Sequence, residues 1–239
     1  MKSINDLKIK LYADGADVDE MKEMYNRGIV HGFTTNPTLM RQAGVEDYEK
    51  FARNVLAEIT DLMISFEVFA DDFDEMEREA KLITSWGDNI YVKIPVTNTK
   101  GESSVPLIKR LTADGLNLNV TAILTVEQVE KVVAALEPGV RTIVSVFAGR
   151  IADSGRDPVS YMEKCVEIVK QKESTELLWA SSRELLNIFQ AEECGCDIIT
   201  VTTGILNKLK NVGRDLKDFS LDTVKMFHKD AVSAGYKIV

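Results

Sequence analysis

Residues 91–96 read Tyr-Val-Lys-Ile-Pro-Val, so Lys93 lies inside an otherwise apolar segment near the middle of the chain. Lysine is almost never fully buried unless it is paired or has a chemical task. Apolar surroundings favour the neutral amine, which attacks ketones and forms the imine of a Schiff-base enzyme. The alternative is an edge strand whose lysine points into water. The segment by itself supports both interpretations equally.

Polar side chains recur at the ends of other apolar segments. Taken singly, Asp14 is typical of a helix cap, and Asn36, which precedes Pro37, is typical of a turn. The joint pattern favours one shared pocket, because the ends of barrel strands converge on one face. The polar groups at these ends come from Asp14, Thr34, Asn36, Glu67, Lys93, Asn119, Thr121, Ser145, Arg150, Ser181 and Arg183.

These residue types predict cleavage of a carbon–carbon bond near a ketone. An iminium on Lys93 would withdraw electrons, so a bond two atoms away breaks once a base removes a hydroxyl proton from the departing carbon. Asp14 suits that task. Glu67 with Thr121 suits the handling of the water that is released and taken up at the imine. Hydrogen-bonding groups for sugar hydroxyls come from Asn36, Asn119 and Ser145.

Two arginines predict a site for the anionic end of a substrate. Arg150 and Arg183 follow the sixth and seventh expected strands. We expect a helix to open at Ser181-Ser182-Arg183, where its N-terminal amides would add to anion binding. Late strands of barrels often carry phosphate sites. The alternative is a pair of surface arginines.

The elements that position these residues alternate between short apolar and longer amphipathic segments. Strict alternation predicts parallel strands with right-handed crossovers, and eight units predict an α/β fold, a single (β/α)8 TIM barrel over residues 1–239. No Gly-x-Gly-x-x-Gly follows the first strand, which disfavours a dinucleotide fold. The expected strands are 10–13, 32–34, 62–69, 90–94, 116–120, 142–146, 177–180 and 198–201. The expected helices are 18–27, 48–59, 73–85, 104–113, 126–136, 158–171, 182–193 and 205–209.

An extra amphipathic helix is expected beyond the eighth unit, at about 221–234 within a C-terminal segment of 220–235. Ser220 is its expected N-cap. The acidic run 71–75 is expected to open the third barrel helix, because carboxylates suit the positive end of the helix dipole. That run therefore has a structural interpretation.

The bulk composition narrows the class of protein. The 239 residues are 45% hydrophobic and 28% charged, as in ordinary globular domains, and the formal net charge is −9. The sequence contains no basic patch, so a nucleic-acid partner is not expected. Neither a signal peptide nor a membrane span is expected. Cys165, Cys194 and Cys196 lack metal-like spacing and predict reduced thiols in the cytoplasm. With only two histidines, neither a zinc site nor a histidine triad is expected.

Taken together, the chain resembles the transaldolase family, and more closely its short bacterial branch, which includes the fructose-6-phosphate aldolases. The resemblance covers nearly the whole chain. Its most specific motifs are Gly-Phe-Thr-Thr-Asn-Pro-Thr at 32–38 and Val-Lys-Ile-Pro-Val-Thr at 92–97. The others are Tyr-Ala-Asp at 12–14, Asn-Val-Thr at 119–121, Ser-Val-Phe-Ala-Gly-Arg at 145–150 and Ala-Ser-Ser-Arg at 180–183.

The resemblance implies a role for each matching residue. It makes Lys93 the Schiff-base lysine, Asp14 the general base, and Glu67 with Thr121 the pair that holds the catalytic water. It implies a metal-free, cofactor-free cytoplasmic enzyme of the pentose phosphate pathway that acts on sugar phosphates. It also implies a C-terminal helix that packs on a neighbouring subunit, in a pentamer or decamer. The implied contacts to the dihydroxyacetone moiety are Thr34, Asn36, Asn119 and Ser145, and those to phosphate are Arg150, Ser181 and Arg183.

Two positions favour transaldolase over simple aldolase. The aldolases of this branch usually have glutamine at the position of Glu67 and tyrosine at that of Phe147. Departures from the family pattern occur at Gly15 and Ser182, and the loops 152–158 and 210–218 have no assigned role. Three alternatives therefore stay open: an aldolase that releases dihydroxyacetone, a transaldolase for a sulfonated ketose, and a catalytically silent sugar-phosphate binder.

Overall fold

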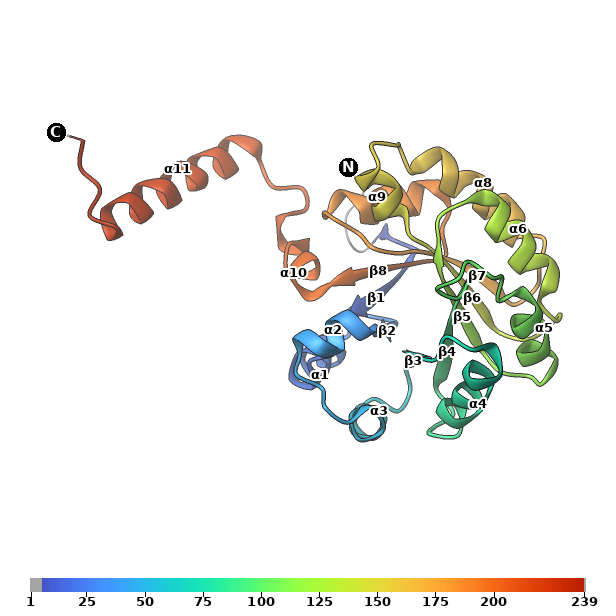
Figure 1. Ribbon diagram of the computed structural model, residues 1–239. Helices are drawn as coiled ribbons and strands as arrows, with labels where there is room; N and C mark the ends of the chain where they lie inside the picture. Colours follow the sequence, from blue (N-terminus) through green and yellow to red (C-terminus); the bar gives the residue numbers. More distant parts are fainter. Residues whose placement is uncertain (1–5, 239) are drawn as a thin grey trace. The chain divides into compact units, whose positions relative to one another are not determined.

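Eight parallel strands close into a barrel in chain order, in a computed structural model that describes residues 6–238 (Figure 1). This confirms the predicted TIM barrel. The barrel belongs to one compact unit, Lys8–Leu206. Its strands are β1 (Lys10–Asp14), β2 (Gly32–Thr34), β3 (Met63–Glu67), β4 (Ile90–Pro95), β5 (Leu118–Ile123), β6 (Thr142–Val146), β7 (Thr175–Trp179) and β8 (Ile198–Thr202).

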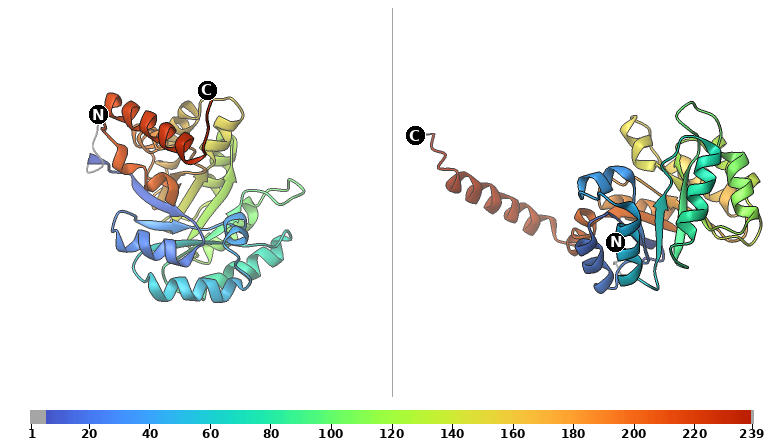
Figure 2. Two further views of the ribbon diagram at one scale, coloured as in Figure 1. Left: turned by 90° about the vertical axis from the view of Figure 1, so that its left-hand side faces the viewer. Right: turned by 60° about the horizontal axis from the view of Figure 1, so that its bottom comes forward.

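Helices surround the ring of strands, as two further views show (Figure 2). Several begin at the acidic or hydroxyl residues that their sequences favour as N-caps. Asp72 accepts the backbone N–H groups of Asp74 and Glu75, so the acidic run is structural as predicted. The helices of this unit are α1 (Val18–Asn26), α2 (Pro37–Gln42), α3 (Tyr48–Glu58), α4 (Phe73–Thr84), α5 (Val105–Ala113), α6 (Val126–Ala135), α7 (Ala148–Asp153), α8 (Val159–Val169), α9 (Leu186–Cys194) and α10 (Thr203–Leu206).

Barrel closure decides between the two interpretations of the Lys93 segment. Strand β4 pairs with β3 on one side and with β5 on the other, where Glu67 and Asn119 are the partners of Lys93. It is therefore not an edge strand. Residues of a strand alternate between the two faces of the sheet, so Tyr91 and Lys93 face the barrel interior while Val92 and Ile94 face the helices. Both faces are covered, which explains why the whole segment is apolar except for the lysine.

One close approach in the barrel interior requires a glycine. The ring of Tyr12 lies over Gly32, and a Cβ built at Gly32 would come within 2.5–2.8 Å of three ring carbons. These residues are register partners on β1 and β2. The absent side chain makes room for Tyr12, which packs in a buried cluster with Tyr91, Ile143, Leu178, Ala180 and Ile198.

Some boundaries differ from expectation. The helix after β7 begins at Leu186 rather than at Ser182, and Ser181-Ser182-Arg183 form a loop. The short helices α2 and α7 were not expected, because neither is long enough to show a periodic apolar pattern. The last helix, α11 (Leu216–Ser233), begins earlier than predicted, and Asp215 rather than Ser220 is its N-cap.

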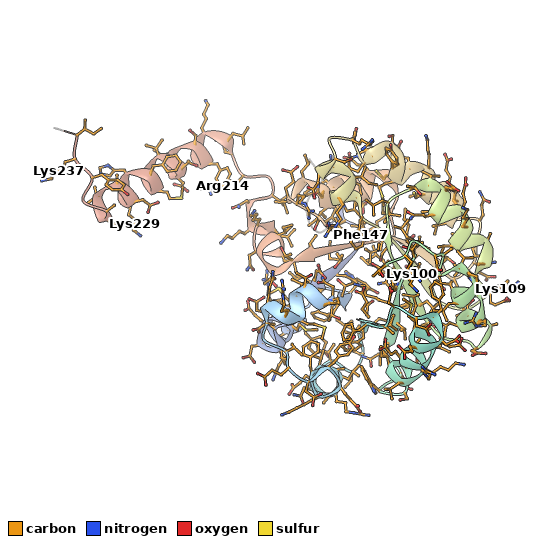
Figure 3. The ribbon with its side chains drawn as sticks, viewed as in Figure 1. Lys100, Lys109, Phe147, Arg214, Lys229 and Lys237 are labelled. Carbon is orange, nitrogen blue, oxygen red and sulfur yellow. The ribbon has the colours of Figure 1, made fainter. Side chains whose placement is uncertain are left out.

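The second unit, which includes residues 207–238, contains α11 and a short 3-10 helix, η2 (Leu209–Asn211). None of the α11 residues is buried, and Leu216, Phe219, Val224 and Phe227 are among its exposed apolar side chains. Arg214, labelled in Figure 3, pairs with Asp222 and lies 4.7 Å from the centre of the Phe219 ring. Within residues 6–238, no helix is both long and apolar enough to cross a membrane.

Candidate active site

A cavity of about 410 Å³ opens among the carboxyl ends of the strands. It brings together every predicted site residue except Arg183. The convergence expected from the sequence therefore exists, with groups from six of the strands and from the loops that follow them. The predicted residues that line it are Asp14, Thr34, Asn36, Glu67, Lys93, Asn119, Thr121, Ser145, Phe147, Arg150 and Ser181.

Lys93 is only 6% exposed, yet its amine is not isolated. Nζ donates to the backbone oxygen of Thr35 at 2.7 Å and lies 3.1 Å from Oε2 of Glu67. A buried charge is tolerated only with such partners. The two contacts fix the amine at the cavity wall, where a carbonyl carbon can reach it.

Asp14 is held by a directed chain of hydroxyl groups. Thr34 donates its Oγ1 proton to Asp14 Oδ1 at 2.7 Å, and Thr200 Oγ1 lies 2.6 Å from Thr34 Oγ1. Because the Thr34 hydroxyl has a single proton, Thr200 must donate in the second bond. Burial raises the pKa of Asp14, while the charge of Lys93 and the Thr34 hydrogen bond oppose that rise. A raised pKa makes this carboxylate a stronger base than one in water.

A second hydrogen-bond chain crosses β3, β5 and β6. Ser145 donates to Asn119 Oδ1 at 2.7 Å, and Asn119 Nδ2 donates to Ser65 Oγ at 3.1 Å. All three residues are buried. Since the Ser145 proton is engaged, its oxygen is left to accept from a substrate hydroxyl. The chain also orients the Asn119 amide, whose second N–H remains available to the cavity.

The loop residue Asn36 serves as a helix cap as well as a cavity wall. Its Oδ1 accepts the N–H of Leu39 at the start of α2. That bond fixes the side chain, with Oδ1 engaged and the amide N–H₂ available. The cap interpretation and the substrate-contact interpretation are thus compatible.

The two arginines differ in their surroundings. Arg150 lines the cavity, and its guanidinium carbon lies 5.9 Å from the centre of the Phe147 ring, which Figure 3 labels. Arg183 is not among the lining residues. Its guanidinium forms a two-pronged ion pair with Asp153 and donates to the carbonyl and hydroxyl oxygens of Ser181, at 2.8 and 3.0 Å. Arg183 thus holds the Ser181 loop.

The same loop explains a glycine in α7. A Cβ built at Gly149 would lie 1.6 Å from the backbone oxygen of Ser181, and Gly149 N donates to Ala180 O at 3.3 Å. Ser181 itself has a φ of 63°. The hydrogen bond from Arg183 also lowers the pKa of Asp153, which keeps the ion pair charged. The Ser181 loop and α7 therefore meet beside Arg150, and this contact requires a glycine at position 149.

Thr200 is a site residue that the sequence reasoning missed. It lines the cavity and is buried, in a strand that otherwise reads Ile-Ile-x-Val-Thr. The sequence could have indicated Thr200, because it lies two residues before the end of β8, at a position whose side chain alternation places inside the barrel. Gln42 and Leu178 also line the cavity, and Asp153 was not recognised as the partner of Arg183.

Comparison with known proteins agrees with the geometry. A family model described as Transaldolase/Fructose-6-phosphate aldolase matches residues 11–238. The chain is 34% identical over 231 residues to a probable transaldolase of Chelativorans sp. (strain BNC1), covering 96% of this chain and 100% of the relative. It is 33% identical over 231 residues to a probable transaldolase of Thermoanaerobacter sp. (strain X514), with the same coverage.

Solved structures show the fold at lower identity. Dihydrodipicolinate synthase from Rhodopseudomonas palustris is similar with a TM-score of 0.61 and 14% identity, over 98% of this chain and 82% of that chain. The 3-hexulose-6-phosphate synthase from Salmonella typhimurium has a TM-score of 0.57 and 16% identity, over 84% of this chain and 91% of that chain. These two structural similarities support only the barrel fold. The family match and the relatives above 30% identity go further, and by them the chain is an enzyme of the transaldolase/fructose-6-phosphate aldolase family.

Proposed function

We propose that this enzyme is a transaldolase, which carries a dihydroxyacetone unit on Lys93 from a ketose phosphate to an aldose phosphate. One observation carries the proposal. The Lys93 amine is buried 3.1 Å from Glu67, in one cavity with the partly buried carboxyl of Asp14. A catalytically silent sugar binder has no need of a buried amine beside two carboxylates, so that alternative is disfavoured.

The first step is imine formation at C2 of the ketose. The neutral amine of Lys93 attacks the carbonyl carbon, and loss of the C2 oxygen as water leaves the protonated imine. Glu67 is near enough to take the ammonium proton before attack and to return a proton to the departing oxygen. Thr121, on the same cavity wall, would hold the water that leaves.

The second step is cleavage of the bond between C3 and C4. Asp14 accepts the proton of the C4 hydroxyl, the bond breaks, and its electrons flow into the protonated imine. An aldehyde leaves, and a three-carbon enamine stays on Lys93. The enamine then attacks the carbonyl carbon of an acceptor aldehyde, whose oxygen takes the proton from Asp14. Hydrolysis of the new imine returns the free amine and releases the product ketose.

Two features favour transfer over release of dihydroxyacetone. Release needs protonation of the enamine carbon by a nearby acid, and Phe147 has no hydroxyl that could supply or relay a proton. Glu67 in place of glutamine is the second feature. Substrates of this chemistry include fructose 6-phosphate or sedoheptulose 7-phosphate as donors, with erythrose 4-phosphate or glyceraldehyde 3-phosphate as acceptors. A sulfonated ketose such as 6-deoxy-6-sulfofructose needs the same chemistry and remains the second candidate donor.

The proposal is tested by measuring whether consumption of the donor ketose depends on an added acceptor aldose. With fructose 6-phosphate as donor, we expect turnover when erythrose 4-phosphate is added and little free dihydroxyacetone without it. The double variant Glu67→Gln/Phe147→Tyr should release several times more dihydroxyacetone, and Phe147→Leu, which adds no hydroxyl, should not. Free dihydroxyacetone produced by the unmodified enzyme at the rate of ketose consumption would instead identify an aldolase.

We further propose a cytoplasmic homo-oligomer, a pentamer or decamer, in which α11 packs on a neighbouring subunit. The exposed apolar side chains of α11 support this, because such surface is commonly covered in an assembly. Sedimentation velocity of the full chain should give a species of five or ten subunits. A monomer at micromolar concentration would contradict it.

A further inference from the structure

A second cavity, of about 610 Å³, lies at the amino-terminal end of the barrel. Its walls come from the first residues of β1, β3, β4 and β7 and from the segments before β2, β3, β6 and β7. It shares no lining residue with the active-site cavity. The buried cluster that contains Tyr12, Tyr91 and Leu178 fills the barrel between them, because the two tyrosines line one cavity and Leu178 lines the other.

Two buried phenols of this cavity have no protein partner. Tyr12 is 3% exposed and Tyr91 is 4% exposed, yet neither hydroxyl has a hydrogen-bond partner among residues 6–238. Neither phenol oxygen is among the fully enclosed polar atoms of the described chain, so both reach the cavity and are free to donate to a ligand there.

The charged and polar groups around these phenols are mostly hydrogen-bond donors. Lys10 and Arg141 both line the cavity, against the single carboxylate of Glu176, which Lys10 contacts at 2.7 Å. His31 Nδ1 accepts the N–H of Leu11 at 3.3 Å, so the ring proton is on Nε2 and His31 offers a donor. Two cations, an imidazole N–H and two phenols form a lining that suits an anion.

We propose that this cavity binds a small metabolite that carries an oxyanion, either a phosphate monoester or a carboxylate. The donors would hold the anion, and Leu62 and Met63 with the tyrosine rings would contact its carbon skeleton. The volume is in the range of small-molecule sites and exceeds what a free inorganic ion needs. Burial also raises the pKa of Tyr91 to about 12, which keeps this phenol protonated and able to donate.

The test must separate this cavity from the active site, where Arg150 is a second candidate for anion binding. We would therefore measure binding of inorganic phosphate and of malonate by equilibrium dialysis, using the full-length Arg150→Gln variant as the parent. We expect saturable binding of at least one of the two probes, near one per chain. Binding of phosphate alone or of malonate alone would assign the site to phosphate monoesters or to carboxylates.

Variants at the cavity should abolish this binding. Arg141→Gln changes an exposed side chain, and Tyr12→Phe/Tyr91→Phe removes two hydroxyl groups while the rings remain. Each should weaken binding about tenfold or more, as expected when hydrogen bonds to a charged group are lost. The matched control, Arg156→Gln/Tyr161→Phe, makes the same kinds of change on and before α8 and should bind as the parent does. The proposal would be overturned if the parent showed no saturable binding or if all variants bound equally. If the double tyrosine variant folds poorly, the Arg141→Gln result alone tests the proposal.

Discussion

Asp14 and Lys93 each depend on partners that reach them from other strands. Lys93 is held by a backbone oxygen and by Glu67, and Asp14 is held by Thr34 from β2, which Thr200 supports from β8. The pattern of polar residues at the strand ends was enough to predict most of the side chains that line the cavity, although it missed Thr200 and wrongly included Arg183. That pattern could not predict which of these side chains hydrogen-bond to one another, because the pairing depends on the register between strands that are far apart in the chain.

The Thr34 hydroxyl should set the acid limb of the activity profile. Asp14 must be ionised to act as a base, so activity falls as the pH drops through its pKa. The Thr34 hydrogen bond lowers that pKa, and Thr34→Val, which keeps the shape, should raise it further. The acid limb of kcat/KM plotted against pH should therefore move to higher pH. An unmoved or lowered limb would show that Asp14 is not the group whose ionisation the profile reports.

Arg150 and Arg183 should differ in their effects on substrate. Arg150→Gln removes a cation from the cavity wall, so KM for fructose 6-phosphate should rise by about tenfold or more, while turnover of unphosphorylated fructose changes little. Arg183→Ala should raise KM for the phosphorylated substrate less, because its guanidinium is engaged with Asp153 and Ser181. Equal effects of Arg150→Gln on both substrates would remove Arg150 from the anion site.

At the scale of elements, most strands and helices follow directly from local pattern, and the exceptions have identifiable causes. Ser182 resembles an N-cap, but the Ser181 loop is held by Arg183 and by its contact with Gly149, so α9 begins only at Leu186. Ser220 also resembles an N-cap, yet Asp215 already accepts the N–H groups of Lys217 and Asp218. In both places a tertiary contact or an earlier cap overrides the local signal.

The packing of β1 on β2 gives a test of the barrel interior. Gly32→Ala would place a methyl group against the Tyr12 ring, and overpacking of this kind typically costs about 1–3 kcal/mol of unfolding free energy. Gly15→Ala is the matched control, because a Cβ at Gly15 meets no atom within 4 Å and its φ is not positive. Urea unfolding should show a loss for Gly32→Ala alone. Equal stabilities would mean that Tyr12 is free to move aside.

At the scale of the whole molecule, eight alternating units were sufficient to predict a closed barrel, and the barrel in turn explains why polar residues from distant parts of the sequence share one cavity. The same closure creates the second cavity at the opposite end, which no sequence motif marks. In a chain with a net charge of −9, an anion can be held only where local cations gather, and both cavities have such cations, in Arg150 and in Lys10 with Arg141.

The central claim is the covalent intermediate on Lys93. Its most direct measurement is intact-protein and peptide mass spectrometry after incubation with fructose 6-phosphate and borohydride, in parallel with Lys93→Met. We predict a reduced adduct of the dihydroxyacetone unit on the peptide that contains Lys93, and no adduct in the variant. If fructose 6-phosphate gives none, the same experiment with sulfofructose separates a different donor from a wrong mechanism. An adduct on another lysine, or none with either ketose, would contradict the assignment of Lys93.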